Sequence, residues 1–374
     1  MLPAFLFLFI SALGCLYLIY ACVLSVTFPE NAPAKPARSP AVTILKPLRG
    51  EDVALRSNLA SFCAQEYSGE VQLVFGVMDF DDPAIPIVED LMASFPSRKI
   101  ELVIDSRVHG TNLKISNLLN MMQRVRHDRI VLADSDIGAA PDYLQRIVAA
   151  LEAPGVCAIT CLYNGVALGG IWSRLAALAI DGHFLPNALV GLHSRLATPC
   201  FGSTIALRRE QLDEIGGFAA FSDCLADDYA IGAALRQKGG SVVIPPLLVA
   251  HSCTETSLKE LWNHELRWAR TIRTVDPRGY AGSLITHPLP FALLALALGA
   301  QAWGAAMAII AILCRTVLLL LTARKHGLAP PACWLTPIRD VLSFAVFIWS
   351  YRGRGVEWRG RRYVVEPGGT LGAN

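Results

Sequence analysis

An apolar run without a single charge opens the chain: Leu2 to Val26 contains no Asp, Glu, Lys or Arg. About 20 apolar residues are enough to span a bilayer. A signal peptide would carry a basic residue before a shorter apolar core, and Ala32-Pro33-Ala34 is a poor cleavage site because proline stands in its middle. Lys35 and Arg38 follow the run, which by the positive-inside rule places the next segment in the cytoplasm. We therefore predict an uncleaved membrane anchor over residues 1–27.

A second apolar region lies near the other end, within a predicted membrane region over residues 277–374. Pro288 to Ala323 is long enough for two short spans joined by a tight turn, with Arg315 standing alone near its end. Pro337 to Tyr351 is too short to span easily and is expected to lie in the interface or to re-enter. A basic tail follows, and it contains Arg352, Arg354, Arg359, Arg361 and Arg362.

The composition agrees with a membrane protein and excludes other classes. Hydrophobic residues make up 53% of the 374 residues and charged residues only 17%, whereas ordinary soluble domains are nearer one quarter charged. With a net charge of +2 and no basic stripe with interleaved aromatics, nucleic acid is not expected as a partner. The ten cysteines include no C-x-x-C pair, so neither a zinc site nor a disulfide framework is expected, and a reducing compartment fits.

Between the apolar ends, residues 28–276 alternate short β-branched runs with amphipathic stretches. This alternation predicts an α/β fold with a mainly parallel sheet. In such sheets ligands bind beyond the carboxyl ends of the strands. The expected strands are Val42–Leu45, Val71–Val77, Ile100–Ile104 and Ile130–Ala133, and the expected helices are Ala54–Gln65, Ala84–Phe95, Asn112–Arg126 and Tyr143–Leu151.

Acidic residues follow two of these strands. Asp79 comes after the second strand, and Asp134-Ser135-Asp136 comes after the fourth. In extended chain, Asp134 and Asp136 point the same way, so they are candidate ligands for one Mg²⁺ or Mn²⁺, with diphosphate oxygens and water completing the shell. The alternative is a polar turn after a buried strand, because Asp is common there.

Asp227-Asp228-Tyr229 precedes another helical stretch. The two acids are either the N-cap and first-turn residues of that helix, or one of them is a general base for a hydroxyl group. We favour Asp228 as the base, with the charge of Asp227 raising its pKa.

A helix is predicted from Ser257, which forms a capping box with Glu260, to about Arg273. On it, His264, Arg267 and Trp268 share one face because they are spaced at i, i+3 and i+4. That face is either an ordinary surface with a packed tryptophan, or it binds a diphosphate and an acceptor through charge-assisted hydrogen bonds.

Two weaker signals indicate a nucleotide site. Asn112 and Lys114 open a helix, where backbone donors and a cation favour phosphate. The glycine-containing loop Pro199–Ser203 precedes an apolar strand and is a candidate substrate-lining turn. No G-x-x-x-x-G-K-[ST] or G-x-G-x-x-G motif stands at a strand–helix junction, which disfavours NTPase and dinucleotide-binding functions.

Taken in order, Asp79, Asp134-Ser135-Asp136, Asp227-Asp228-Tyr229 and His264-Glu265-Leu266-Arg267-Trp268 resemble the D, D-x-D, E/D-D, Q-x-x-R-W signature of family 2-like GT-A glycosyltransferases. The chain more closely resembles the ceramide glucosyltransferase family, glycosyltransferase family 21. Further stretches that resemble this group are Ile44-Leu45-Lys46-Pro47-Leu48, Asp79-Phe80-Asp81-Asp82-Pro83-Ala84 and Glu357-Trp358-Arg359-Gly360-Arg361-Arg362-Tyr363. Within the family, the runs HELRWARTIR and PCFGSTIALRR are similar to those of bacterial hopanoid-biosynthesis glycosyltransferases.

The resemblance implies a GT-A domain that binds a UDP-sugar and transfers the sugar, with inversion, to a hopanoid or ceramide hydroxyl. Asp79 is then expected to bind the nucleotide, Asp134 and Asp136 the metal and diphosphate, and Asp228 to be the base. Lys46, Asn112 and Lys114 complete the expected nucleotide-sugar site, and His264, Arg267 and Trp268 serve the diphosphate and the acceptor. Two positions depart from the pattern: His264 replaces Gln, and Asp227 replaces the Glu of many relatives.

Three rival functions are disfavoured by the sequence. A processive polysaccharide synthase needs a channel, which these few apolar runs do not build alone. An inactive scaffold has no physical need for clustered carboxylates, and a transporter is disfavoured because no ionisable pair lies within the predicted spans, where Arg315 stands alone. The expected location is the bacterial inner membrane, with the catalytic domain facing the cytoplasm. Which sugar and which lipid are used stays open.

Overall fold

The computed structural model describes the chain except residues 1, 30–38, 354, 359–360, 366–370 and 374. The described residues form two compact units. The α/β unit comprises those of Glu30–Tyr163, Pro199–Thr254 and Gly369–Asn374, and the helical unit those of Met1–Pro29, Asn164–Thr198 and Glu255–Gly368. Predictions that rested on Ala32-Pro33-Ala34, Lys35, Arg38, Arg354 and Arg359 lie outside the described residues.

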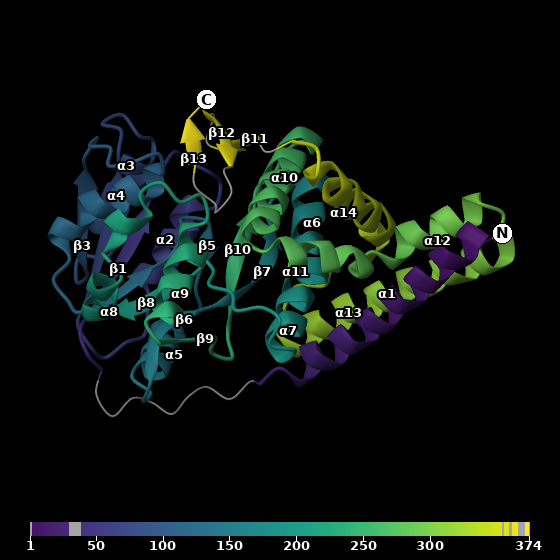
Figure 1. The fold of residues 1–374 in the computed structure, drawn as a ribbon. Helices are drawn as coiled ribbons and strands as arrows, with labels where there is room; N and C mark the ends of the chain where they lie inside the picture. Colours follow the sequence, from purple (N-terminus) through teal and green to yellow (C-terminus); the bar gives the residue numbers. More distant parts are fainter. Residues whose placement is uncertain (1, 30–38, 354, 359–360, 366–370, 374) are drawn as a thin grey trace. The chain divides into compact units, whose positions relative to one another are not determined.

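A seven-stranded sheet organises the α/β unit, with strand order β3-β2-β1-β4-β8-β6-β9 (Figure 1). The first four strands in this order are parallel, β8 runs antiparallel to both of its neighbours, and β9 is parallel to β6. The predicted α/β fold with a mainly parallel sheet is therefore confirmed. The strands of this sheet are β1 (Val42–Pro47), β2 (Val71–Val77), β3 (Lys99–Ile104), β4 (Arg129–Leu132), β6 (Val156–Thr160), β8 (Ile205–Arg208) and β9 (Ser241–Val243).

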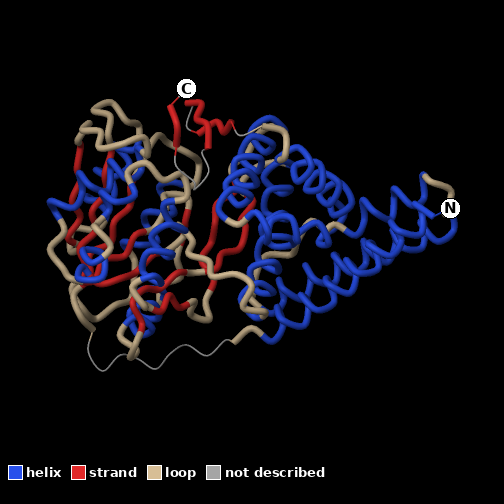
Figure 2. Tube along the Cα trace, in the orientation of Figure 1, coloured by secondary structure: helices blue, strands red, loops and turns tan. Residues whose placement is uncertain are grey.

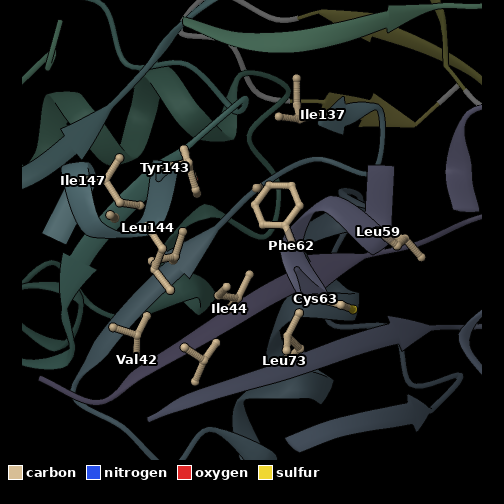
Figure 3. Close-up of a cluster of buried hydrophobic side chains, with 14 of the residues drawn as sticks. Val42, Ile44, Leu59, Phe62, Cys63, Leu73, Ile137, Tyr143, Leu144 and Ile147 are labelled. Atoms are coloured by element: carbon tan, nitrogen blue, oxygen red, sulfur yellow. The ribbon is translucent and has the colours of Figure 1, made fainter. Parts of the chain in front are cut away.

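Both faces of the central strands are buried, which explains their nearly continuous apolar sequences. Val42 and Ile44 of β1 point into one core and Leu45 into the other, as the two-residue period of a strand requires. Figure 3 shows the first core, where Phe62 and Tyr143 meet edge to face with ring centroids 5.5 Å apart.

Helices cover each face of this sheet. Those carrying the first core are α2 (Leu55–Cys63), α3 (Ala84–Ser94) and α5 (Tyr143–Leu151), and those carrying the second include α4 (Leu113–Met121), α8 (Arg209–Glu214) and α9 (Asp227–Gln237). Short helical turns follow at Met122–Arg124 (η1) and Phe218–Phe221 (η3). The remaining strands are β5 (Ile137–Gly138), which pairs antiparallel with β10 (Leu248–Cys253), and β7 (Leu162–Ala167) and β13 (Leu371–Ala373).

The helical unit is built mostly from helices (Figure 2). Its N-terminal helix α1 (Leu2–Thr27) packs against α7 (Leu185–His193), α12 (Pro288–Ala297) and α13 (Gln301–Lys325). The other helices are α6 (Ile171–Ala179), the π-helical turn η2 (Ile180–Phe184), α7 (Leu185–His193), α10 (Leu258–Val275), α11 (Pro277–Gly282), η4 (Ser283–Thr286), α12 (Pro288–Ala297), α13 (Gln301–Lys325), η5 (Cys333–Leu335) and α14 (Thr336–Ser350). A hairpin of β11 (Gly355–Trp358) and β12 (Arg361–Val365) follows.

Three described helices are long and apolar enough to cross a membrane: Leu2–Thr27, Ile171–His193 and Gln301–Lys325. A fourth span is formed if Pro277–Thr286 and Pro288–Ala297, bent by 60°, act as one. These helices mark the chain as a membrane protein. The helix Ile171–His193 was not anticipated, because Arg174, Asp181 and His183 interrupt its apolar sequence.

Arg315 of α13 is not alone, contrary to the expectation from the sequence. Its Nε donates to Asp340 Oδ1 of α14 at 3.1 Å, and its Nη2 donates to the carbonyl of Thr286 at 2.6 Å. His183 also contacts Asp340, with 3.0 Å between Nε2 and Oδ1. Arg315 and Asp340 thus form an ionisable pair among the apolar helices, so a solitary charge does not disfavour a transporter; the pair is satisfied by its neighbours, as buried charges require.

Candidate functional site

Carboxylates from two distant parts of the chain meet around one buried lysine in the α/β unit. Lys114, in the first turn of α4, places its Nζ 2.8 Å from Asp134 Oδ1 and 3.1 Å from Asp227 Oδ2. Asp134 follows β4, and Asp227 opens α9. The first strands are parallel, so α4 and the segment after β4 reach the same edge of the sheet, where ligands bind in open α/β folds.

The carboxylates of this cluster stabilise the positive charge of Lys114. The Lys114 side chain is only 9% exposed, so burial opposes its charge, but the carboxylates of Asp134, Asp227 and Asp228 outweigh that effect and raise its pKa. Lys114 was predicted to bind the donor. In the structure its ammonium is already held between two carboxylates.

Asp228 lies in the first turn of α9 and is held by backbone donors. Gly202 N donates to Oδ2 at 2.8 Å, and Tyr229 N donates to Oδ1 at 2.7 Å. Neither acid caps the helix, because the N-cap is Ala226. Burial, followed by the charge of Asp227, raises the pKa of Asp228 to about 6. A carboxylate with this pKa is ionised at neutral pH and is still a useful proton acceptor.

Gly202 contacts both acidic motifs. The sequence indicated only that this residue lies in a glycine-containing loop. Its carbonyl accepts from Asp134 N at 3.3 Å, while its own N–H binds Asp228. A Cβ at this position would lie 2.7 Å from Asp134 Oδ2 and 3.2 Å from Lys114 Nζ. The absence of a side chain at position 202 is therefore what allows Asp134 and Asp228 to approach one loop.

We expect Gly202→Ala to lower turnover by about tenfold or more, because the new methyl group displaces the Asp134 carboxylate and a misplacement of about 1 Å is costly in an active site. Steady-state kinetics with thermal unfolding would check this. The matched control is Gly282→Ala, where a Cβ meets nothing within 4 Å. Equal activity of the two variants would contradict the role of Gly202.

Lys46 has a different position from the one predicted. It is fully buried, and its Nζ donates to the carbonyls of Asp134 at 3.0 Å and Ile137 at 3.1 Å while lying 3.5 Å from the Phe62 ring centroid. Burial lowers its pKa to about 7, against the raising effect of Asp136 and Asp134. Lys46 thus holds the turn that carries the acidic pair.

That turn also changes the expected geometry of Asp134 and Asp136. Ile137 N donates to Asp134 O at 3.2 Å, so the segment turns instead of continuing as extended chain. Asp136 Oδ2 lies 3.4 Å from His251 Nε2 on β10. The extended chain expected through Asp134-Ser135-Asp136 was therefore wrong, because the strand β4 ends at Leu132.

Asp79 and Asn112 are both at element ends, but only Asp79 is exposed. Asp79 follows β2, and its Oδ1 accepts from Asp81 N at 3.1 Å. Asn112 is fully buried and caps α4 by accepting from Lys114 N and Ile115 N. Its Nδ2 donates to Cys224 O at 2.7 Å and to Asp227 Oδ1 at 3.3 Å. Asn112 therefore fixes α4 against the segment that leads to α9.

The residues predicted for the diphosphate and acceptor, His264, Arg267 and Trp268, lie on α10 in the helical unit. Ser257 caps this helix by accepting from Glu260 N at 3.2 Å, as expected, but Glu260 reaches back to Thr256 and not to Ser257.

Neighbouring elements of the helical unit fix the orientation of α10. His264 Nδ1 lies 2.8 Å from Glu255 Oε1, and the His264 ring meets that of Trp268 at 4.3 Å. Arg339 of α14 binds Glu265 through two hydrogen bonds of 2.5 and 2.7 Å. Glu255 was missed because a single acid before an N-cap has no distinctive spacing.

Asp134 and Asp136 are the candidate ligands for a divalent cation. Among the described residues, no group of three or more His, Cys, Asp and Glu side chains is arranged to hold a metal ion. Asp134 and Asp136 nevertheless remain 35% and 40% exposed, and two carboxylates with substrate oxygens and water are a usual environment for Mg²⁺. The residues present therefore fit a cation that binds together with its substrate.

A mainly parallel α/β sheet with carboxylates gathered at one edge, joined in sequence to membrane helices, is the arrangement that the resemblance to GT-A membrane glycosyltransferases predicts. The chain belongs to glycosyl transferase family 21, whose sequence profile matches residues 6–371. The predicted family and enzyme class are confirmed.

Two ceramide glucosyltransferases of Caenorhabditis elegans are among the relatives. Ceramide glucosyltransferase 1 is 24% identical over 233 residues, covering 62% of this chain and 49% of the relative. Ceramide glucosyltransferase 3 is 26% identical over 275 residues, covering 68% and 56%. The chain thus matches about half the length of these curated relatives. A mannosyltransferase from Pyrobaculum calidifontis, solved with GDP-Man and Mn²⁺, shares the fold with a TM-score of 0.50 at 18% identity, covering 92% of this chain and 99% of that one.

Proposed function

We propose that this protein transfers a sugar from a UDP-sugar to the hydroxyl group of a membrane lipid, a hopanoid or a ceramide, with inversion at the anomeric carbon. The observation that carries the proposal is the convergence of Asp134, Asp227 and Asp228 around Lys114 and Gly202. The ceramide glucosyltransferase names of the relatives support a lipid acceptor.

In this reaction Asp228 takes the proton of the acceptor hydroxyl, and the oxygen attacks the anomeric carbon as the nucleoside diphosphate leaves. The N–H groups of Gly202 and Tyr229 orient the Asp228 carboxylate, which is ready to accept a proton because its pKa is raised. No second carboxylate is needed as a covalent nucleophile in a single displacement.

Asp134 and Asp136 would hold a divalent cation, Mg²⁺ or Mn²⁺, which when bound supplies positive charge to the diphosphate. The Mn²⁺ and GDP-Man in the Pyrobaculum calidifontis mannosyltransferase support such a cation. The family resemblance assigns Arg267 and Trp268 to the diphosphate and the acceptor, and Asp79 to the nucleotide. Lys46, Asn112 and Lys114 then act by positioning these groups, as their burial favours.

The test is to incubate the purified protein with labelled UDP-glucose or UDP-N-acetylglucosamine against ceramide or bacteriohopanetetrol. We expect one lipid to be labelled and EDTA to abolish the labelling, which added Mn²⁺ or Mg²⁺ restores. Labelling that persists in EDTA would show that the sugar transfer needs no divalent cation. Failure of every donor with every acceptor would overturn lipid glycosylation by these substrates.

The pH dependence follows from the raised pKa of Asp228. The base must be ionised, so kcat/KM is expected to fall as the pH is lowered through about 6 and to level off above it. An ordinary carboxyl group, with its pKa near 4, would leave the rate unchanged over that interval. A pH–rate profile of lipid labelling, with protein stability checked at each pH, distinguishes the two cases.

A further inference from the structure

We infer that Asn58 and Ser252 are positioning residues that hold the acidic turn, residues 134–137, in a shape suited to bind a divalent cation. The inference rests on the proposed function and extends it to two side chains outside the acidic motifs. Asn58 lies on α2 and Ser252 on β10. Both are buried, with exposed fractions of 6% and 7%, and buried polar side chains are normally hydrogen-bonded for a structural or functional reason.

The backbone of the acidic turn is held at each of its carbonyl groups. Lys46 Nζ binds the first and the last of them, at 3.0 and 3.1 Å. Asn58 Nδ2 donates to the carbonyl of Ser135 at 3.3 Å, and Ser252 N donates to that of Asp136 at 2.9 Å. These donors come from β1, α2 and β10, so three separate elements fix one short segment of the α/β unit.

The two positioning residues also bind each other. Ser252 Oγ donates to Asn58 Oδ1 at 3.1 Å. The partners determine the orientation of the amide, because the carbonyl of Ser135 only accepts and must therefore face the NH₂ group. A Cβ at Gly138 would lie 3.2 Å from Asn58 Oδ1, so the backbone of β5 lies close to the amide. Ser252 thus acts on the acidic turn directly through its N–H group and indirectly through Asn58.

The consequence of this arrangement concerns cation affinity. Asp134 Oδ1 lies 2.8 Å from Lys114 Nζ. Asp136 Oδ2 lies 3.4 Å from His251 Nε2. Because each carboxylate has a different neighbour, the backbone between them decides whether both can reach one cation. Hydrogen bonds behind the ligands of a metal set their orientation, and losing one typically weakens affinity or activity by about 10- to 100-fold.

Binding of Mn²⁺ in the presence of UDP tests the inference without turnover. Titration of the detergent-solubilised full chain, with free Mn²⁺ followed by electron paramagnetic resonance, gives the Kd. Asn58→Ala should raise this Kd about tenfold, at a temperature well below the melting temperature of the variant. A Kd equal to that of the wild type overturns the inference.

Ser61→Ala is the matched structural control. Ser61 lies on the same helix as Asn58, and its Oγ accepts from Ala139 N at 3.0 Å, just beyond the acidic turn. This variant should also lower the melting temperature, but it should leave the Kd for Mn²⁺ unchanged. Equal rises of the Kd in Ser61→Ala and Asn58→Ala would come from a general loosening of α2 and would overturn the positioning role.

A double-mutant cycle tests the link between the two positioning residues. Ser252→Ala removes Oγ and leaves the N–H group that binds Asp136. It should weaken Mn²⁺ binding in the wild-type background, by less than Asn58→Ala does. In the Asn58→Ala background it should have little further effect, because the changes in free energy of residues in direct contact are not additive. Additive losses would show that Ser252 Oγ does not act through Asn58.

Hydrogen–deuterium exchange separates this result from the outcome for the proposed function. Asn58→Ala should speed exchange of the Ser252 amide, whose hydrogen bond ends on the acidic turn, and Ser61→Ala should not. The Mn²⁺ titration needs no lipid, so a failure of lipid labelling leaves it valid. If the wild-type protein binds no Mn²⁺ with UDP, the cation and its positioning both fail, while the exchange rates still decide whether Asn58 holds the turn.

Discussion

Asp228→Asn is expected to lower lipid glycosylation by about 10²- to 10⁴-fold, the usual contribution of a positioned general base. Asparagine keeps the size of the side chain and one oxygen to accept from Gly202 N or Tyr229 N, but it takes up no proton. The loss should appear in kcat with the donor KM little changed. Labelling of lipid with radioactive donor, followed over long times, measures the residual rate.

Two opposing effects act on the stability of the variant, so thermal unfolding is measured beside turnover. The folded state raises the pKa of Asp228 to about 6, so ionised Asp228 destabilises the fold above that pH, and a neutral amide removes this cost. The amide NH₂ group of asparagine, however, leaves one of the two backbone N–H donors without an acceptor. Asp90→Asn is the matched control, as Asp90 forms an exposed pair with Arg56. Near-normal turnover of Asp228→Asn would refute its role as the base.

Lys114→Met should have the largest effect on stability. Removing one partner of a buried ion pair commonly costs about 3–5 kcal/mol, and we expect the lower end because the Asp134 side chain is 35% exposed. Without the ammonium, Asp134 and Asp227 repel each other across the segments that they connect. Thermal unfolding should show this loss, and Mn²⁺ should raise the melting temperature of the variant more than that of the wild type.

The control for this variant is Lys99→Met. Lys99 and Glu70 form a pair whose side chains are about half exposed, and such surface pairs contribute little to stability. If Lys114→Met and Lys99→Met have the same melting temperature, the charges of Asp134 and Asp227 are neutralised by groups other than Lys114. If Mn²⁺ raises the melting temperatures of the wild type and of Lys114→Met by the same amount, the cluster around Lys114 takes no part in cation binding.

The sheet was predictable because its central strands are buried on both sides. Val71–Val77 is apolar apart from Gln72, and its bounds match β2. The first strand extends two residues past its predicted end at Leu45, to Pro47, since the aliphatic stem of Lys46 enters the core. Antiparallel β8 carries no distinguishing sequence signal, because direction depends on the strands beside it.

The candidate site was predicted in its residue types but not in its contacts. Proximity of Asp134 to the start of α9 follows from the general rule for parallel sheets. Lys46 and Lys114 bind groups of the protein because both are buried, and no local sequence pattern reveals their burial. Likewise, Asp340 as the partner of Arg315 depends on the packing of α13 with α14.

That last contact has a consequence for how the protein enters the bilayer. An arginine at the centre of an inserting helix costs about 2.5–3.5 kcal/mol, and its counter-ion stands 25 residues further along the chain. Until the ribosome has produced Asp340, α13 carries an uncompensated positive charge. Insertion of α13 and docking of α14 are therefore expected to be one cooperative event during biosynthesis, and nascent chains stalled before Asp340 should be membrane-integrated less efficiently than those stalled after it.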